Sequence, residues 1–522
     1  MTSNDRWGSV SADQDASGDA DADELAQLLA MAGGADDPGS GPGGGALADA
    51  LSQGLTTGPI DDIPGREADD AESLAALRVV EAELDQRWPE TRIAPSLDRI
   101  RALVEVLGDP QRSFPVIHVA GTNGKSSVTR MIDALLTRIG PRTGRYTSPH
   151  LQRATERIAL DGIPISARRY VELYTELAPY LGIVDRAQGD GPKLSKFEVL
   201  TGMAFAAFAD APVDVAVLEV GLGGSWDATN VADGVVAAIT PIDIDHVNYL
   251  GPELGGIAAE KAGIIKEGSV ALMAQQDPAA ATVLLERAVQ VGAEVARSGM
   301  EFGVLAREVA VGGQHLRLQG LGGEYDDVYL PLFGEHQAAN ASLALASVEA
   351  FFGAGAARKL DIDAVRDAFA SVRVPGRLER LRVAPTVVVD AAHNPHGARA
   401  AAKAVREEFS FRRLIGVVAI LGDKDAEGIL SALEPVLDEV VITAVASPRA
   451  MDADELGSLA VGFFGADRVV VETRMDAALE TAIGLAEETD DAETPVAGAG
   501  VLVVGSVVAA GEARTLLGKE PA

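Results

Sequence analysis

From about residue 74 onward, short apolar runs of strand length alternate with segments of helix length. The clearest example is the run over residues 114–120, after which apolar side chains recur at residues 128, 131, 132, 135, 136 and 139. These offsets put the apolar side chains on one face of an α-helix. Strands that alternate with helices are typical of α/β layers built on a mostly parallel sheet. The pattern predicts that fold class.

A second series of the same kind occupies the C-terminal part of the chain. Its apolar runs are separated by helix-length segments and cover residues 386–390, 414–421, 440–446, 468–472 and 501–505. They predict a second, doubly wound sheet. Because a Pro-Gly pair is typical of a turn between layers, we place the boundary near Pro375-Gly376. The predicted domains are residues 73–373 and the smaller unit 374–522.

The N-terminal residues follow neither pattern. Residues 1–70 contain twelve glycines and fifteen acidic side chains against two arginines. Such a segment cannot bury enough apolar surface to offset a chain entropy of about 1–2 kcal/mol per residue. We therefore predict a disordered, acidic and glycine-rich tail over residues 1–72. Its short Leu/Ala runs leave open transient helices or partner-binding segments.

Composition narrows the class of protein. The 522 residues carry a net charge of −34, which repels polyanions, so we expect no nucleic-acid partner and no membrane partner. Because the chain has no cysteine, disulfides, thiolate metal sites and a cysteine nucleophile are excluded, and Mg²⁺ is the metal that fits best. Residues 1–10 lack an apolar signal core, and no uncharged stretch reaches the roughly 18 residues that span a bilayer. We expect a cytoplasmic protein and a monomer.

The residues between the first predicted strand and its helix have the composition of a phosphate-binding loop. Glycines let backbone N–H groups face an anion, the helix N-terminus adds partial positive charge, and a lysine supplies a cation for the β- and γ-phosphates. Val119 stands where the strict pattern has its first glycine, so the motif is a shortened variant, and an ordinary strand-to-helix turn is the alternative. We expect ATP, with a serine hydroxyl close to Mg²⁺, at Gly121, Thr122, Asn123, Gly124, Lys125, Ser126 and Ser127.

Two further polar residues lie at or beyond strand ends. Glu219 lies near the end of the apolar run 213–220, and an acid at the end of a buried strand beside a phosphate loop commonly holds a metal ion. His246 follows the run 235–240, where open α/β sheets place their ligands. Beside Glu219 we predict that His246 is a metal ligand or its orienting partner. Taken alone, Glu219 is equally well explained by a structural role, and a lone His246 is better explained by one.

Ten short motifs, in order along the chain, resemble one family. They are HVAGTNGK (118–125), TSPHL (147–151), KFE (196–198), EVGLGG (219–224), DH (245–246), EKAGIIK (260–266), GEHQ (334–337), PGRLE (375–379), DAAHNP (390–395) and GDKD (422–425). This set resembles the bifunctional folylpolyglutamate synthase/dihydrofolate synthases, which are Mur-ligase-like ATP-dependent amide ligases.

The resemblance implies a P-loop-type ATPase domain followed by a smaller Rossmann-like domain, with the active site in the cleft between them. ATP would phosphorylate a carboxylate of dihydropteroate or of a reduced folate such as tetrahydrofolate, and ADP would be released. The amine of L-glutamate would then attack the acyl phosphate and form an amide. The implied substrates are therefore small molecules, with Mg²⁺ as the metal.

Roles are also implied by position within the motifs. Ser148, Glu219 and His246 resemble the Mg²⁺ ligands, directly or through water. Lys261 resembles a lysine that becomes carbamylated, and a carbamate is an anionic oxygen ligand where an ammonium would be repelled by the metal. The implied nucleotide contacts are Asn340, Arg377 and Asp390, and the implied catalytic residues are Lys125, Lys261, Asp390 and His393.

Some residues leave alternatives open. Asn394 could be no more than a helix cap, because helix-forming residues follow it. No role is assigned to His336 or His396, and His315 is taken as a surface histidine. Ser225 stands where the family usually has an arginine, which removes a cation near the ligand groups. Ser126, where many members have glycine, is closer to the Mur-ligase form and should be harmless.

Two other functions compete with the folate ligase. Cell-wall Mur ligases place a whole substrate-binding domain before the phosphate loop, whereas here only about fifty predicted structured residues precede it. A nucleotide-binding protein that has lost catalysis is the third possibility, and Ser225 is the only residue that suggests it.

Overall fold

The structure is a computed structural model that describes residues 69–88, 94–353, 359–488 and 498–521. The tail predicted over residues 1–72 therefore lies almost entirely outside the described residues. Its last four residues are described, and helix α3 begins among them at Ala71, capped by the Asp70 carboxylate, which accepts from Ser73 N.

The first sheet has the strand order β4-β3-β2-β5-β1-β6-β7-β8. It is parallel from β2 to β8, whereas β3 and β4 are antiparallel additions at one edge. The central strands β1 and β5 are buried along their whole length, as expected for a parallel sheet covered on both faces. The strands are β1 Val116–Ala120, β2 Thr143–Tyr146, β3 Ile158–Leu160, β4 Ile163–Pro164, β5 Val215–Glu219, β6 Gly234–Ile239, β7 Val270–Met273 and β8 Glu294–Arg297.

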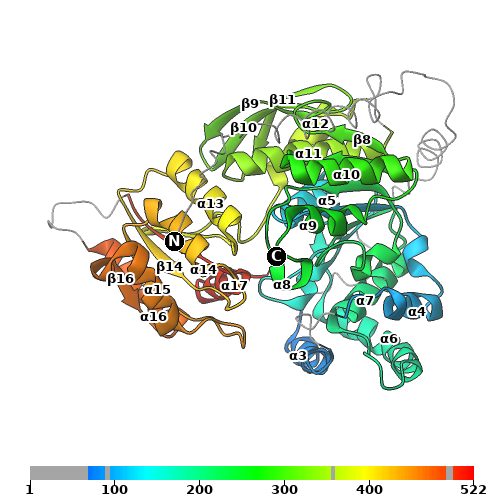
Figure 1. Cartoon of the computed structure of the whole chain (residues 1–522), viewed down its shortest axis with the longest axis horizontal. Helices are drawn as coiled ribbons and strands as arrows, with labels where there is room; N and C mark the ends of the chain where they lie inside the picture. The colour runs from blue at the N-terminus through cyan, green and yellow to red at the C-terminus, as the bar shows by residue number, and fades with distance from the viewer. Residues whose placement is uncertain (1–68, 89–93, 354–358, 489–497, 522) are drawn as a thin grey trace, which may run out of the picture.

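Helices cover both faces of this sheet (Figure 1). The helices α3, α4, α6 and α7 share one apolar cluster with the sheet, whereas α5, α11 and α12 share another. A third cluster packs α9 and α10 against β6 and β7. The helices are α3 Ala71–Asp85, α4 Asp98–Val106, α5 Lys125–Ile139, α6 Ala167–Ala187, α7 Lys196–Asp210, α8 Val247–Leu250, α9 Leu254–Ala262, α10 Pro278–Val291, α11 Glu335–Phe351 and α12 Ile362–Ser371.

A small antiparallel sheet, which the hydrophobic pattern does not predict, follows β8. Its order is β11-β10-β9, with β9 Gly303–Ala310, β10 Gly313–Gln319 and β11 Glu324–Leu330. Leu316, Leu318 and Tyr325 join the apolar cluster of α5 and α11. The turn between β9 and β10 points away from that cluster, and Val311 at its tip is fully exposed.

The second large sheet has the order β12-β13-β17-β14-β15-β16 and is parallel except for β12. The apolar clusters on its two faces contain α13 to α15 and α16 to α17 respectively. All five predicted runs of the second series are strands here. The elements are β12 Glu379–Val383, β13 Thr386–Val389, β14 Arg413–Val418, β15 Glu439–Ile442, β16 Val469–Val471, β17 Ala499–Val504, α13 Pro395–Glu408, α14 Ala426–Leu433, α15 Ala453–Phe464, α16 Met475–Glu487 and α17 Val507–Leu516.

The structure confirms the predicted α/β class, with two parallel sheets joined by the segment between α12 and β12. The boundary that we predict at residues 373–374 falls in this segment and stays a prediction. Of the helices that the structure describes, none combines the length and apolar character needed to cross a bilayer. Loops that follow the carboxyl ends of β1 and β6 contact loops of the second sheet, as the hydrogen bonds below show.

Candidate active site

The phosphate loop lies between β1 and α5, as predicted. Gly121 has φ +142° and Gly124 has φ +93°, a region that side-chain-bearing residues rarely adopt. A Cβ on Gly121 would overlap Thr240, and one on Gly124 would lie 2.7 Å from Asn340 Oδ1. Both glycines are therefore required by conformation and by close packing. The packing also places Asn340, an implied nucleotide contact, directly against the loop.

Two lysines lie over this loop, of which Lys261 is buried and Lys125 is partly buried. Lys125 Nζ donates to the carbonyl oxygens of Gly121 and Thr122 at 3.2 Å each, and Lys261 Nζ donates to Gly121 O at 2.8 Å. Burial lowers the pKa of the Lys125 amine. Burial, and next the charge of Lys125, lower the pKa of Lys261 to about 7. Two neighbouring amines thus converge on the backbone that is expected to hold the phosphates.

Glu219, at the end of β5, organises the opposite side of the loop. Its Oε1 accepts from Ser126 Oγ at 2.7 Å, and its Oε2 accepts from Ser148 N at 3.3 Å. Burial raises the pKa of this carboxyl group, and the Lys125 charge opposes that rise. Ser127 is buried and contacts Gln337 instead, at 3.4 Å. Of the two predicted hydroxyls, it is that of Ser126 which faces the carboxylate.

The donor set near Glu219 fits Mg²⁺. The implied ligands are the Glu219 carboxylate, the Ser148 hydroxyl and the His246 imidazole; the structure places Ser148 N 3.3 Å from Glu219 Oε2, and Ser148 and His246 line the same cavity. The described part of the chain contains no group of three or more His, Cys, Asp or Glu side chains that could hold a metal. Because Mg²⁺ usually keeps several waters and takes only one or two carboxylates together with substrate phosphates, such a short protein ligand set suits Mg²⁺.

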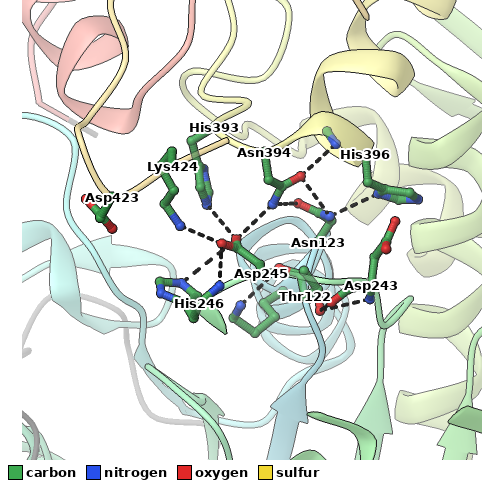
Figure 2. Close-up of polar contacts among 12 residues, drawn as sticks. Thr122, Asn123, Asp243, Asp245, His246, His393, Asn394, His396, Asp423 and Lys424 are labelled. Carbon is green, nitrogen blue, oxygen red and sulfur yellow. Dashed lines mark hydrogen bonds and ion pairs between the residues drawn. The ribbon is translucent and has the colours of Figure 1, made fainter. Parts of the chain in front are cut away.

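Asp245 is the centre of a polar network that joins the two sheets (Figure 2). Its Oδ1 accepts from Lys424 Nζ at 2.6 Å and its Oδ2 from Asn394 Nδ2 at 2.9 Å. His393 Nε2 and His246 Nε2 lie 3.6 and 3.9 Å from Oδ2. Although burial alone would raise the pKa of Asp245, the nearby His393 ring and the positive charge of Lys424 hold it far below its usual value.

A second contact between the sheets lies beside the first (Figure 2). Asn394 Nδ2 donates to Asn123 Oδ1 at 3.0 Å, and Asn123 Nδ2 lies 2.9 Å from His396 Nδ1. Asn394 Oδ1 accepts from Gly397 N at 2.8 Å and caps α13. The cap predicted for Asn394 is therefore confirmed, and the same amide also contacts the phosphate loop. The Asn123 side chain is turned toward the second sheet.

Asp390 shapes the segment that carries Arg377. It is buried, and its carboxylate oxygens accept from Leu378 N at 2.9 Å and Ala392 N at 2.8 Å. Burial raises the pKa of Asp390, and the positive charge of Arg377 opposes the rise both there and at Glu219. Arg377 therefore adds its charge to the same site. The His393 ring contacts Ala391 O at 3.0 Å through Nδ1.

A cavity of about 410 Å³ opens beside these groups, which is within the range that holds a small organic ligand. Its wall is shared by both sheets. His246, Gly221 and Leu222 also line the small cleft at the phosphate loop, with Lys125 and Lys261. The two spaces therefore share wall residues Gly221, Leu222 and His246. The aromatic side chains in the cavity wall are Trp88, Phe197, Trp226 and Tyr249. Polar side chains in the wall include Ser148, His150, His246, His393, Lys424 and Arg449.

Residue-by-residue reasoning misses part of this arrangement. Asp245 and Lys424 belong to two of the motifs above, and yet the sequence assigns neither a role. His396 is left without one as well, because nothing local marks it as a partner of Asn123. His315, taken as a surface residue, is half exposed and lies 3.4 Å from Asp327. The feature of the sequence that could have identified Asp245 and Lys424 as site residues is their occurrence within short charged motifs.

Comparisons with known proteins agree with the motifs. The Mur ligase middle domain family matches residues 191–348, and the Mur ligase glutamate ligase domain family matches residues 376–506. A Mycobacterium tuberculosis dihydrofolate synthase/folylpolyglutamate synthase is 58% identical over 466 residues, which is 86% of this chain and 96% of that protein. A Bacillus subtilis protein of the same name is 33% identical, over 70% of this chain and 84% of its own length.

Solved structures give the same result. Mycobacterium tuberculosis folylpolyglutamate synthase complexed with ADP matches with a TM-score of 0.83 and 57% identity, over 86% of this chain and 100% of that one. An Escherichia coli protein in complex with DHPP and ADP matches with a TM-score of 0.73 and 29% identity, over 84% and 97% respectively. The predicted resemblance is thus confirmed, and the chain belongs to the dihydrofolate synthase/folylpolyglutamate synthase family of ADP-forming ligases.

Proposed function

We propose that this chain uses ATP to add L-glutamate to dihydropteroate and to tetrahydrofolate. The observation that carries the proposal is that two neighbouring spaces share the wall residues Gly221, Leu222 and His246. One is lined by the phosphate loop with Lys125 and Lys261, and the other is an aromatic-walled cavity large enough for a pterin and its aminobenzoate. A carboxylate at the end of a substrate in the cavity would lie next to the γ-phosphate of ATP on the loop.

The reaction requires two steps. A carboxylate oxygen of the substrate attacks the γ-phosphorus of ATP, the bond to the β-phosphate oxygen breaks, and ADP leaves. The glutamate amine then attacks the carbonyl carbon of the acyl phosphate, inorganic phosphate leaves with the C–O bond electrons, and the amine loses a proton. Lys125 and Arg377 would offset charge on the transferring phosphoryl group, the usual task of cations in this chemistry.

Glu219, Ser148 and His246 would hold Mg²⁺ on the cavity side of the loop. When bound, the metal supplies charge neutralisation at the phosphate oxygens. Support comes from the shared position of these residues, since Glu219 binds Ser148 N at 3.3 Å and both Ser148 and His246 line the cavity. Ser126 would stay on Glu219 and fix its orientation.

Lys261 is the proposed site of carbamylation. A carbamate forms from a neutral amine, and the burial of Lys261 beside the Lys125 ammonium favours the neutral form. Converting one of the two adjacent cations into an anion would also remove their mutual repulsion. The carbamate N–H could keep the contact that the amine now makes with Gly121 O.

The second sheet would contribute charge and closure. Lys424 and His393 line the cavity and reach Asp245 from the second sheet, so docking of this sheet brings both groups next to the reacting carboxylate. Asp390 would act by fixing the segment of Arg377 through two backbone amides. Asn340, packed against Gly124, would contact the nucleotide.

One assay tests the reaction and its substrates together. Purified protein is incubated with ATP, Mg²⁺, L-glutamate and either dihydropteroate or tetrahydrofolate, and ADP and product mass are measured. We expect glutamate-dependent ADP release with both acceptors. With ¹⁸O in the acceptor carboxylate, label should appear in inorganic phosphate. ADP release with a peptidoglycan precursor and none with either pterin acceptor would contradict the proposal, as would unlabelled phosphate.

A cytoplasmic location and a monomeric state also remain our proposals. The acidic composition and lack of cysteine suit a cytoplasmic enzyme, and both substrates' sites are formed within one chain. Light scattering of the purified protein at several concentrations measures the oligomeric state directly.

A further inference from the structure

A buried arginine in the last helix has no part in the proposed chemistry. Arg514 lies in α17, and only 4% of its side chain is exposed. Its Nε donates to Gln152 Oε1 at 2.8 Å, its Nη1 pairs with Glu379, and its Nη2 donates to Glu520 O at 2.7 Å. The guanidinium thus connects three segments that are far apart in sequence.

The first of these segments carries Ser148. Gln152 Nε2 also donates to Thr515 Oγ1 at 3.1 Å and to Lys519 O at 2.8 Å, so its amide is fixed to α17 from both ends. A Cβ on Gly511 would overlap the backbone of Leu151, which shows how closely the helix approaches this loop. The other side of the loop, Ser148 to His150, lines the cavity.

The second segment carries Arg377. Glu379, which pairs with Arg514, accepts from Gly376 N through its other carboxylate oxygen at 2.8 Å. Gly376 O in turn accepts from Ala391 N at 2.8 Å, beside Asp390. The carboxylate of Glu379 therefore bridges Arg514 and the backbone that precedes Arg377.

We propose that Arg514 is a positioning residue that holds the Ser148 loop and the Arg377 segment in one fixed arrangement. A guanidinium suits this task because it is planar, always charged and donates in several fixed directions. Through Gln152 it fixes the position of the Ser148 loop in the cavity wall. Through Glu379 it fixes the segment that carries Arg377, the proposed nucleotide contact. The kinetic consequence rests on the proposed function, since it uses the roles given there to Ser148 and Arg377.

Three variants and one control separate positioning from simple support. Gln152→Ala removes the loop's contacts with Arg514, Thr515 and Lys519, Glu379→Gln weakens the contact toward Arg377, and Arg514→Met removes the guanidinium's contacts with both Gln152 and Glu379. Arg382→Met is the control, because Arg382 lies on the same strand as Glu379 and forms an exposed pair with Glu487 at 3.3 Å. For each variant we measure the Kd of AMPPCP by calorimetry, and kcat and the KM of dihydropteroate by ADP release.

The expected pattern is selective. Gln152→Ala, which loses a hydrogen bond from the charged guanidinium, should raise the KM of dihydropteroate about tenfold and leave the AMPPCP Kd within about twofold. Glu379→Gln should weaken AMPPCP about tenfold or more, as for a charged hydrogen bond, with little change in that KM. Arg514→Met should change both constants, and Arg382→Met neither. If both single-contact variants alter the two constants equally, or if Arg514→Met alters neither, the proposal is wrong.

The proposal can still be tested if the Arg514→Met variant does not fold. If Arg514→Met fails to unfold cooperatively, the two single-contact variants decide the outcome by their selectivity, because general destabilisation would not separate one substrate from the other. The AMPPCP measurement needs no turnover. Should the wild-type protein bind AMPPCP and yet use no pterin acceptor, the proposed function would fail, whereas the Glu379→Gln and Arg382→Met results would still report on Arg514.

Discussion

The two sides of the active site are built in different ways. On the phosphate-loop side, Ser126 at the start of α5 donates to Glu219 at the end of β5, and Lys125 donates to the loop carbonyl of Gly121. On the side of the second sheet, Lys424 and Asn394 donate hydrogen bonds to Asp245, which belongs to the loop after β6 of the first sheet. The first side is complete within one sheet, whereas the second depends on how two sheets dock. We therefore expect substitutions on the phosphate-loop side to impair the chemical step. Substitutions on the side of the second sheet should impair domain closure.

The largest effect should come from Lys125→Ala, which tests the self-contained side. It removes a partly buried cation from the phosphoryl-transfer site, and losses of about 10²–10³-fold in kcat are typical for one preorganised electrostatic group. ADP release measures the change. Lys193→Ala, at an exposed lysine, is the control and should keep wild-type turnover. A Lys125→Ala enzyme with near-normal kcat would remove the lysine from its proposed role.

The second-largest effect should come from Lys261→Ala. Rescue of this variant by small carboxylates would distinguish a carbamate from a cation on the phosphate-loop side. If Lys261 acts as a carbamate, the variant should lose about 10²-fold in kcat, the size expected for one electrostatic group, and regain part of it with millimolar acetate or formate as a replacement anion. The same salts should leave Lys125→Ala inactive, because that variant lacks a cation. Failure of every small carboxylate to restore activity would argue for an uncarbamylated lysine.

Lys424→Met tests the docked side. It leaves Asp245 buried without its closest cation, and loss of a charged hydrogen bond of about 1.5–3 kcal/mol corresponds to roughly ten- to a hundredfold in kcat/KM. Positional isotope exchange in ATP without glutamate reports acyl phosphate formation separately. The control is Lys403→Met, since Lys403 forms an exposed pair with Glu335. Equal behaviour of the two variants would show that the contact with Asp245 is unimportant.

The smallest change is expected from Ser225→Arg, which restores the family arginine. Ser225 Oγ donates to Glu260, and Ser225 N donates to Glu260 O at 2.9 Å. Because the Glu260 carboxylate would pair with the new guanidinium, we expect less than the full benefit of a free cation. The KM of the pterin acceptor should fall by less than about fivefold, consistent with the low value of partly exposed ion pairs. An unchanged KM would mean that position 225 does not act on the substrate.

The phosphate-loop side of the site can be predicted from the sequence, whereas the side formed by the second sheet cannot. The phosphate loop is predictable because its glycines, lysine and serines are consecutive and lie between a strand and a helix. The partners of Asp245 are not, because Asn394 and Lys424 are 149 and 179 residues away, and only the docking of two sheets brings them together. Asn394 illustrates the limit well, since its capping role is local and predictable, whereas its contact with Asn123 is not.

The fold is predicted to a similar extent. The buried parallel strands β1, β5 and β6 are evident because their apolar runs are continuous, and the five runs of the second series are strands, whereas β2, with the sequence TGRY, and the antiparallel edge strand β12 were not predicted. The small sheet of β9 to β11 was not, because exposed residues follow one another along β9 and the register shifts within both of its strand pairs. A strand that alternates poorly between apolar and polar residues carries too weak a period-2 signal to be recognised.

The hairpin turn at the tip of that small sheet offers a practical handle. Val311 projects fully into solvent and Gly312 adopts φ +81°, and exposed turn tips are the places where proteins best accept inserted residues. A short peptide tag or a fluorophore attached there would touch neither the phosphate loop nor the cavity. Since the natural chain contains no cysteine, a single one introduced at position 311 would be the sole thiol available for labelling.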